Sequence, residues 1–262
     1  MRKLDSKSPF FFPFFSLVAK QERLTGNLRS IMDQSIFRAY DIRGIYPTEL
    51  NESDAKEIAR GLIKMLAPKR VALGRDARLS APVIQEALTE VFLESGVEVI
   101  DLGLIATDMS VFAAGVLDVD LVVMITASHN PKEWIGMKIG LRGGEPFGGE
   151  GEIQALADLI RRGDKRTLGA TGVRKQRREK KDILSDWIKH VLTFVDPSVI
   201  KPLKLVVDAG NGVAGPIVQE LIRHLPLKLI PLYFEPDGAF PHHLPNPIEP
   251  ENTEDLRRRV IE

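Results

Sequence analysis

The sequence predicts an α/β protein with mostly parallel sheets flanked by helices, arranged as two consecutive units of which the second is incomplete. Three observations support this prediction. Short apolar runs alternate with segments of helical periodicity from residue 32 onward. The apolar runs show no polar alternation, which is typical of strands buried on both faces of a parallel sheet. The pattern stops near residue 161 and restarts near residue 183.

The composition excludes several classes of protein. The chain has 262 residues, 44% hydrophobic and 27% charged, which is typical of a globular protein rather than a disordered or collagen-like one. Lys plus Arg and Asp plus Glu are both 36, so no overall charge attracts nucleic acid or an acidic membrane. The absence of cysteine excludes disulfides, thiolate catalysis and zinc–cysteine or iron–sulfur sites, and it fits a reducing compartment. We therefore expect a cytoplasmic protein with no nucleic-acid or membrane partner.

Residues 1–31 are expected to lie outside the fold. The stretch Pro9 to Ala19 is the most apolar in the chain, but it is shorter than the ~20 residues that span a bilayer, and Pro13 interrupts it. The basic residues before it resemble the start of a signal peptide, although Asp5 is unusual there. We interpret the segment as a disordered or mis-translated tail, with a weak targeting signal or a structured extension as the alternatives.

The first unit is expected over residues 32–175. Apolar runs predict strands at 70–74, 97–102 and 121–125, and helical periodicity predicts helices at 51–67, 82–95 and 110–117. One face of the first helix should hold Ala55, Ile58, Leu62, Ile63 and Leu66. Ser80 is expected to cap the second helix, which has Pro82 in its first turn. The residues of that helix expected to face inward are Val83, Ala87, Val91 and Phe92.

A basic stretch from Arg161 to Lys181 interrupts the pattern. Only Asp164 and Glu179 oppose its many Lys and Arg residues, so a nucleic-acid patch is one interpretation. No aromatic residue is interleaved for base stacking, however, and we favour a solvated connector between two domains.

The second unit is expected over residues 176–262. Helices are predicted at 183–194 and after the turn at 209–215, and strands at 203–208 and 228–233. Thr253 is expected to cap a final helix. These elements are too few for a complete doubly wound domain, so we expect the second domain to be truncated.

The clearest chemical signature lies at Thr126 to Pro131, directly after the apolar strand at 121–125. Ligands of parallel sheets bind beyond the carboxyl ends of strands, so a site is expected here. A serine can accept a transferred group, and a neighbouring histidine and asparagine can orient it. Because Ser128 and His129 are adjacent and no Gly-x-Ser-x-Gly elbow exists, classical acyl hydrolysis is disfavoured. A polar turn without chemistry remains the alternative.

Six motifs occur in one order between residues 37 and 252, and their order makes the set specific. They are Phe37-Arg-Ala-Tyr-Asp-Ile-Arg-Gly44, Gly74-Arg-Asp76, Thr126-Ala-Ser-His-Asn-Pro131, Gly136-Met-Lys138, Asp208-Ala-Gly-Asn-Gly212, and His243-Leu-Pro-Asn-Pro247 with Pro250-Glu-Asn252. Together they resemble the α-D-phosphohexomutase superfamily, in particular its bacterial phosphomannomutase/phosphoglucomutase branch. The two expected units would then be the first domain and most of the second.

The resemblance implies an isomerase of carbohydrate metabolism that interconverts hexose 1-phosphate and hexose 6-phosphate, with mannose or glucose as the sugar. It implies that Ser128 is a phosphoserine and that a hexose 1,6-bisphosphate is the intermediate. Arg43 would be a cation near the phosphoserine, Lys138 would match the lysine associated with acid–base work, and His129 would line the same loop. The residues implied in substrate or phosphate binding are Tyr40, Arg43 and Asn130.

Structural roles are the alternatives for these residues. Arg43 could form an ion pair with Asp41 or Asp76, Lys138 could be a solvated lysine, and His129 could orient the loop. Arg75 and Asp76 could equally form a salt-bridge network beneath the site. The turn at 208–212 is expected to be structural rather than phosphate-binding, and His242 and His243 are expected to pack in a linker rather than bind a metal.

The resemblance also implies Mg²⁺ as cofactor, held by the phosphoserine and by aspartates of a loop beyond the Pro-Glu-Asn motif. The chain ends before such a loop, so Ser128 is its only metal ligand of this kind and Mg²⁺ should bind weakly. Ile135 stands where the family usually has an asparagine. We expect a fragment with little activity alone, and the alternative is a non-catalytic remnant that binds a partner or a complementary C-terminal half.

Overall fold

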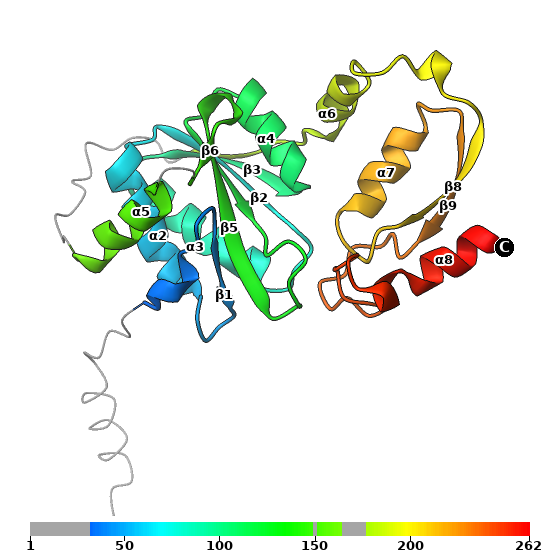
Figure 1. Ribbon diagram of the computed structural model, residues 1–262. Coiled ribbons are helices and arrows are strands. Elements are labelled where there is room, and N and C mark those ends of the chain that lie inside the picture. Colours follow the sequence, from blue (N-terminus) through cyan, green and yellow to red (C-terminus); the bar gives the residue numbers. More distant parts are fainter. Residues whose placement is uncertain (1–31, 149–150, 164–176) are drawn as a thin grey trace, which may run out of the picture. The chain divides into compact units, whose positions relative to one another are not determined.

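The computed structural model describes residues 32–148, 151–163 and 177–262 (Figure 1). The tail expected at 1–31 lies outside the described residues, as does most of the basic stretch. No helix in the described part of the chain is long and apolar enough to cross a membrane.

A mixed sheet runs through the first unit, and in the described residues it has seven strands. They are β1 (Ile42–Ile45), β2 (Arg70–Arg75), β3 (Glu98–Leu104), β4 (Leu121–Ile125), β5 (Trp134–Leu141), β6 (Pro146–Phe147) and β7 (Arg178–Lys180). The order is β1-β5-β4-β2-β3-β7, with β6 paired to β5. The pairs β2–β3, β2–β4 and β3–β7 are parallel, whereas β5 is antiparallel to β1 and β4. The predicted fold class is therefore confirmed.

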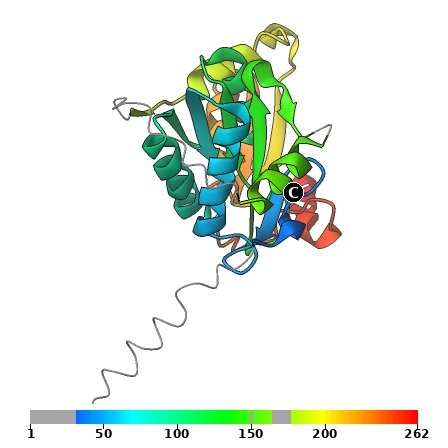
Figure 2. The ribbon, with the colours of Figure 1, turned by 90° about the vertical axis from the view of Figure 1, so that its left-hand side faces the viewer.

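Helices cover both faces of this sheet. On one face lie α2 (Glu52–Leu66), α3 (Ala81–Glu94) and α5 (Glu152–Arg161), which Figure 2 shows in front of the strands, and on the other lies α4 (Thr107–Val116). Within β4, Leu121, Val123 and Ile125 belong to the first core, whereas Val122 and Met124 belong to the second. Successive side chains of a strand point to opposite faces, so a fully apolar strand is what a covered sheet requires.

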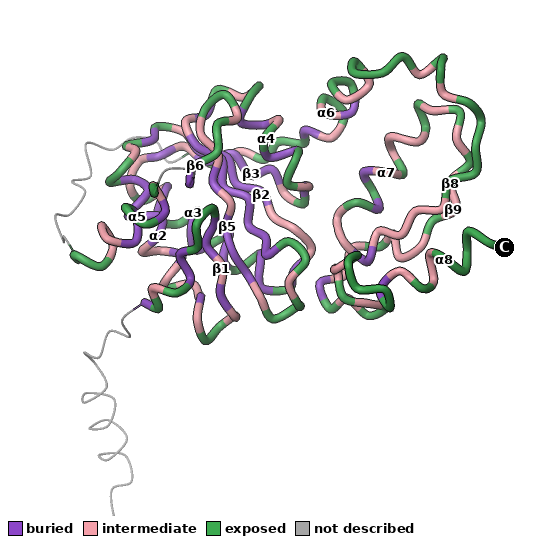
Figure 3. The backbone as a smooth tube through the Cα atoms, in the orientation of Figure 1, coloured by how far each residue is buried: buried purple, intermediate pink, exposed green. Residues whose placement is uncertain are grey.

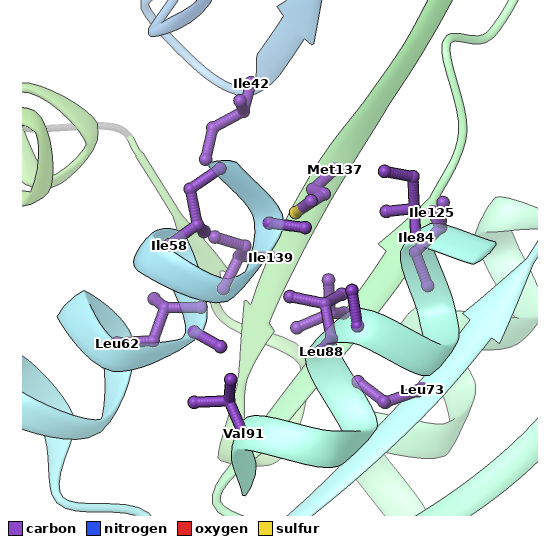
Figure 4. Close-up of a cluster of buried hydrophobic side chains, with 14 of the residues drawn as sticks. Ile42, Ile58, Leu62, Leu73, Ile84, Leu88, Val91, Ile125, Met137 and Ile139 are labelled. Atoms are coloured by element: carbon purple, nitrogen blue, oxygen red, sulfur yellow. The ribbon is translucent and has the colours of Figure 1, made fainter. Parts of the chain in front are cut away.

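The larger core joins α2 and α3 to the sheet (Figure 4). Ile58 and Leu62 of α2 and Leu88 and Val91 of α3 pack beside strand residues such as Leu73. Four of the five residues expected on the inner face of α2 are buried, and Leu66 packs against the core from its margin. In α3 the expectation fails at one position.

Two predictions for α3 are wrong. Val83 is 42% exposed, because the inner face of α3 begins at Ala81 and Ile84 and turns Val83 away from the sheet. Ser80 precedes the helix but makes no capping hydrogen bond, since its backbone is already helical and its hydroxyl is buried without a partner in the described part of the structure. The start of α3 is nevertheless close to the predicted position.

The start of α2 is fixed by a capping box. The Asn51 side chain accepts hydrogen bonds from the backbone N–H groups of Ser53 and Asp54, and the Asp54 carboxylate accepts one from the Asn51 N–H. These bonds satisfy N–H groups that have no partner inside the helix. Ala67, in the left-handed conformation, ends α2 before Pro68.

Strand β7 was not expected within the predicted connector. Residues Arg178–Lys180 pair in parallel with β3, although Arg178 and Lys180 remain exposed. Arg178 donates to the carboxylates of Glu86 on α3 and Asp101 on β3. The end of the basic stretch is thus part of the first sheet.

The second unit contains a separate sheet and further helices. Its strands β8 (Leu203–Asp208) and β9 (Leu227–Leu232) are parallel, and its helices are α6 (Leu184–Val191), α7 (Ala214–Ile222) and α8 (Glu254–Ile261). Short 3-10 helices occur in both units. The first unit has η1 (Gln34–Ile36) and η2 (Arg142–Gly144), and the second has η3 (Pro197–Val199) and η4 (Pro250–Thr253). The prediction that Thr253 caps α8 is wrong, because its hydroxyl instead donates to the Pro250 carbonyl.

The two units differ in burial (Figure 3). Strands β8 and β9 contain no buried residue, whereas β4 is buried throughout. The exposed apolar side chains in this unit include Leu203, Leu205, Val260 and Ile261. Its apolar surfaces are therefore incompletely covered.

Candidate active site

Ser128 lies in the loop that joins β4 to β5, beyond the carboxyl end of a buried parallel strand. The Thr126 N–H donates to the Gly136 carbonyl at 2.9 Å, which closes the base of the loop. Ser128 is exposed and has φ of 55°, in the left-handed region that residues with a Cβ rarely adopt. Such a conformation costs of order 1–3 kcal/mol and persists where the surroundings hold it. The loop thus presents the serine hydroxyl in a constrained backbone.

A short chain of hydrogen bonds holds the N-terminal side of the loop. The Ser128 N–H donates to the Thr126 hydroxyl at 2.9 Å, and that hydroxyl donates to an Asp76 carboxylate oxygen at 2.7 Å. Asp76 follows β2, and its own N–H donates to the Ile125 carbonyl at 3.0 Å. The end of one parallel strand therefore supports the loop that follows its neighbour.

Arg78 holds the C-terminal side of the loop. Its side chain is 0% exposed, and its Nε donates to Asp76 at 3.1 Å. Its Nη1 and Nη2 atoms donate to four carbonyl oxygens, those of Ser128, Asn130, Pro131 and Trp134, at 2.6–3.0 Å. Burial lowers the pKa of the Arg78 guanidinium, and the Asp76 carboxylate opposes that shift.

Arg78 lies outside the six motifs of the sequence. Its only signal in the sequence is its position two residues after Asp76, in the segment that follows the Gly74-Arg-Asp76 motif. The expected network beneath the site exists, but it is built by Asp76 with Arg78 rather than with Arg75.

Arg43 on β1 contacts the residues on both sides of Ser128–His129. Its Nη1 donates to the Asn130 side-chain oxygen at 2.7 Å and to the Ala127 carbonyl at 3.4 Å. Its Nε and Nη2 both donate to one carboxylate oxygen of Asp41, at 2.8 and 2.6 Å. Both interpretations of Arg43 are therefore compatible with its geometry, since the ion pair with Asp41 aims the guanidinium at the serine loop.

Lys138 on β5 forms an ion pair with the same carboxylate, that of Asp41. Its ammonium is 3.2 Å from the Asp41 oxygen that Arg43 binds, and the side chain remains about one-third exposed. Strand β5 was not predicted, yet it brings Lys138 to β1, because Met137 and Gly136 are in register with Ile42 and Arg43. Asp41 thus links two cations from different strands.

Gly136 allows this close approach. A Cβ atom at that position would lie 2.2 Å from the Ile42 carbonyl oxygen and 3.0 Å from that of Thr126. The glycine of the Gly136-Met-Lys138 motif is therefore a packing requirement. Ile135, which stands where the family usually has an asparagine, is buried in the larger core.

His129 and Tyr40 are less closely tied to the site. The Ser128 hydroxyl and His129 Nδ1 are 3.4 Å apart, at the long limit of a hydrogen bond. Tyr40 is 72% exposed in the loop before β1, and within the described residues its hydroxyl has no hydrogen-bond partner. The structure thus brings Ser128, His129, Asn130, Arg43 and Lys138 together but leaves Tyr40 outside their network.

The described residues do not form a magnesium site by themselves. Across 32–148, 151–163 and 177–262, no three His, Asp or Glu side chains gather as metal ligands. The carboxylates beside the loop, Asp41 and Asp76, are each paired with basic side chains. Mg²⁺ requires several oxygen ligands in octahedral order, so Ser128 would need ligands from elsewhere.

The motif at 208–212 forms a turn that contacts the histidines at 242 and 243. The Asp208 carboxylate accepts from the Gly210 N–H at 2.8 Å and lies 3.1 Å from His243 Nε2. His242 stacks on the Tyr233 ring, with 3.8 Å between centroids, and its Nδ1 lies 2.7 Å from the Asn211 side-chain oxygen. These contacts give the turn and both histidines internal partners.

Comparison with known proteins identifies the family. The domain I model of the phosphoglucomutase/phosphomannomutase family, described as alpha/beta/alpha, matches residues 34–167, and its domain II model matches residues 185–262. The chain belongs to this phosphohexomutase family. The resemblance read from the motifs is therefore confirmed, while the boundaries 32–175 and 176–262 stay predictions.

Curated family members are similar over most of the chain. The phosphohexose mutase of Xanthomonas campestris pv. campestris is 41% identical over 226 residues, which is 86% of this chain and 50% of that protein. The phosphomannomutase/phosphoglucomutase of Pseudomonas aeruginosa is 42% identical over 229 residues, covering 86% and 47%. The chain thus spans about half the length of the curated relatives it matches.

Solved structures agree with this similarity. A phosphoglucomutase/phosphomannomutase family protein from Burkholderia thailandensis matches with a TM-score of 0.75 and 34% identity, over 87% of this chain and 50% of that one. A putative phosphomannomutase from Thermus thermophilus matches with a TM-score of 0.73 at 22% identity, over 86% of this chain and 51% of that one. The second match supports the fold alone.

Proposed function

We propose that this chain carries the phosphoserine half of a phosphohexomutase site, in which Ser128 exchanges a phosphoryl group with a hexose phosphate. The observation that supports this most directly is the exposed Ser128 hydroxyl on a constrained loop, with Arg43 bonded to both flanks of that loop. The whole reaction would interconvert hexose 1-phosphate and hexose 6-phosphate through a hexose 1,6-bisphosphate. The sugar would be mannose or glucose.

In the proposed step, a sugar hydroxyl oxygen attacks the phosphorus of phospho-Ser128 and the bond from phosphorus to Ser128 Oγ breaks. The hydroxyl proton passes to a base, and Ser128 Oγ takes up a proton as it leaves. The bisphosphate then reorients, and its other phosphoryl group returns to Ser128 with the same balance. Charge on the transferring group is spread over its oxygens, so positioning and cations supply most of the catalysis.

Arg43 and Lys138 are suited to these two tasks. Four hydrogen bonds hold the Arg43 guanidinium against Asp41 and the loop, so its charge is fixed beside the phosphoryl group before the reaction. Lys138 is partly exposed on the same carboxylate and is the candidate proton carrier at the sugar hydroxyl. Asn130 accepts from Arg43, which favours an orienting role, while direct binding by Tyr40 stays a prediction.

Magnesium enters this proposal only as a cation that would neutralise phosphoryl charge when bound. The described carboxylates near Ser128 are already paired, so the remaining ligands would come from other residues. We assign no step of the serine chemistry to it.

Phosphorylation of Ser128 is the direct test. Incubating the protein with glucose 1,6-bisphosphate should add one phosphoryl group, measured by intact mass, and peptide mapping should locate it at Ser128. Ser128→Ala should abolish the addition, because the accepting oxygen is gone. Ser185→Ala, which removes an exposed serine on α6, is the matched control and should be labelled like the wild type. Labelling that survives in Ser128→Ala would contradict the proposal.

Turnover is a separate question, which a coupled assay with glucose 1-phosphate, glucose 1,6-bisphosphate and Mg²⁺ answers. We expect little or no turnover from this chain alone, because the described residues supply one candidate metal ligand. Turnover comparable to that of a full-length relative would contradict this part of the proposal, while leaving the assignment of Ser128 intact.

Binding of a complementary polypeptide is the second candidate function. The observation that favours it is the exposed apolar surface of the second unit, where Leu203 is 62% exposed on β8 and Ile261 is 86% exposed on α8. Edges and apolar faces of this kind are typical docking surfaces. The partner would be a chain equivalent to the second half of the longer relatives.

Light scattering tests this association. The chain would be mixed with a separately produced second half of the Pseudomonas aeruginosa relative, and a complex of one copy each is expected. Leu203→Glu should weaken the complex, and Val83→Glu, an exposed apolar residue of the first unit, should not. No complex, or equal weakening by both changes, would count against this second function.

A further inference from the structure

We propose that Arg78 is a positioning residue that sets the backbone of the serine loop, residues 126–134, and so controls how Ser128 accepts a phosphoryl group. The catalytic consequence rests on the function proposed above. The structural part, control of the loop backbone, stands independently of it.

Every N–H donor of the Arg78 guanidinium takes part in a hydrogen bond. An arginine has five N–H donors, and here one reaches Asp76 and four reach loop carbonyls. These carbonyls belong to Ser128, Asn130, Pro131 and Trp134, so the contacts run from the serine to the first residue of β5. One side chain therefore fixes the path of the chain after Ser128.

Complete use of these donors separates Arg78 from Arg43. Arg78 is 0% exposed and has no N–H left to donate to a phosphoryl oxygen. Arg43 is partly exposed beside the same loop, and its bonds leave an Nη2 hydrogen unused by the described residues. Arg78 is thus suited to hold the loop, whereas Arg43 is suited to meet the phosphate.

Asp76 connects the two sides of the loop. One of its oxygens accepts from Arg78 Nε at 3.1 Å and from the Thr126 hydroxyl at 2.7 Å. The same hydroxyl accepts the Ser128 N–H, while Arg78 binds the Ser128 carbonyl at 2.8 Å. Both polar groups of the Ser128 backbone are therefore held by one network. This explains how a serine is kept at a φ of 55°.

Lysine cannot reproduce this arrangement. An ammonium has three donors around one nitrogen and lacks the planar fork that reaches several acceptors at once. In Arg78→Lys some of the four carbonyls lose their partner, although the buried positive charge beside Asp76 is kept. That substitution therefore separates the geometry of Arg78 from its charge.

Hydrogen–deuterium exchange on the intact protein tests the structural part. In Arg78→Lys, amides of peptides covering 126–136 should exchange at least about tenfold faster than in the wild type, with those of β2 and β4 unchanged. Thr126→Val, which removes the hydroxyl between Asp76 and Ser128, should give a similar local increase if Arg78→Lys fails to fold. The matched control is Arg142→Lys, an exposed arginine paired with Asp118 and Asp120, which should leave the loop unchanged.

Phosphorylation kinetics test the catalytic part. With glucose 1,6-bisphosphate as donor, Arg78→Lys should lower the maximal rate of Ser128 labelling at least about tenfold, with the half-saturating donor concentration nearly unchanged. Arg43→Lys should instead raise that concentration, because Arg43 is placed to meet the phosphate. A purely structural role of Arg78 would lower the folded fraction without this separation of rate from saturation.

The outcomes distinguish this inference from the proposed function. Wild-type loop exchange and a wild-type labelling rate in Arg78→Lys would overturn the positioning role. Faster exchange throughout the sheet would also overturn it, since it would show a general loss of stability. If the wild type is not labelled but loop exchange still responds to Arg78→Lys, the proposed function fails and control of the loop by Arg78 stands.

Discussion

The left-handed backbone of Ser128 should affect the stability of the protein independently of catalysis. Its φ of 55° lies where a Cβ atom costs about 1–2 kcal/mol, a cost that glycine does not have. Ser128→Gly and Ser128→Ala both remove the hydroxyl, but only alanine keeps the strain. We expect the glycine variant to have the larger free energy of unfolding, by about 1 kcal/mol.

Urea denaturation of the two variants measures this difference. The control pair is Arg60→Gly and Arg60→Ala at an exposed position within α2, where glycine should be the less stable by about 1 kcal/mol. The two pairs should therefore differ in sign. If alanine is the more stable at both positions, the left-handed conformation of Ser128 is not maintained in solution.

The sequence predicted residues that surround Ser128 but not the arginine that holds its loop. The order of motifs indicated Arg43, Lys138 and Asn130. In the structure Asp41 joins Arg43 to Lys138, and Arg43 donates to Asn130. Arg78 bonds to residues 50 to 56 positions away, through carbonyls that every residue type possesses. No side-chain pattern can mark such acceptors, so this role becomes visible only in the fold.

Strand β7 is joined to β3 by an ion pair between Arg178 and Asp101, and the pKa of this Asp101 carboxylate is shifted. Burial alone would raise the pKa of Asp101, but hydrogen bonds from the Gly103 N–H, Gln85 and Arg178 outweigh it and lower the pKa below the ordinary 3.8. A lowered pKa means that ionised Asp101 stabilises the folded state at pH values above the ordinary pKa. That contribution is lost as pH falls through the lowered value.

Asp101→Asn should therefore destabilise the protein at pH 7 by about 1–3 kcal/mol, because Arg178 and Gln85 lose a charged partner. The difference from wild type should narrow below about pH 4, where the Asp101 carboxylate of the unfolded chain becomes protonated, and should be lost as pH falls through the lowered pKa of the folded protein. Urea unfolding at several pH values measures both effects. Asp118→Asn, at an exposed ion pair, should change stability by less than about 1 kcal/mol. A difference that does not vary with pH would contradict the shifted pKa.

Elements were predictable where the pattern was uniform. The apolar runs at β2 and β4 were found because a strand covered on both faces has few polar residues in its middle. Strand β8 was found from its apolar residues, although none of its residues is buried. Strand β5 was missed because two of its residues are glycines and its Lys138 interrupts the apolar run. Pairing with β1 and β4, which only the fold supplies, keeps this strand in place. Val83 was wrongly predicted to face inward, because two faces of helix α3 are both partly apolar.

Across the described chain, burial is distributed unevenly between the two units. The cores on both faces of the first sheet contain most of the buried apolar side chains. Within residues 184–262, the buried apolar side chains are Ile188 and Ile217. Local stability follows buried apolar contacts, so regions with few of them open more easily than the rest of a protein. The second sheet should therefore open without unfolding of the first.

Hydrogen–deuterium exchange can compare β8 and β9 with β2 and β4, which form parallel ladders of similar length. We expect amides of β8 and β9 to exchange at least about tenfold faster, equivalent to a difference of about 1.4 kcal/mol in opening free energy. Adding the second half of a longer relative should slow exchange in β8 and β9 and leave β2 and β4 unchanged, if the exposed apolar surface binds it. Equal protection of the two sheets in the chain alone would mean that the second unit is stable as it stands, and the case for a docking surface there would lose its physical basis.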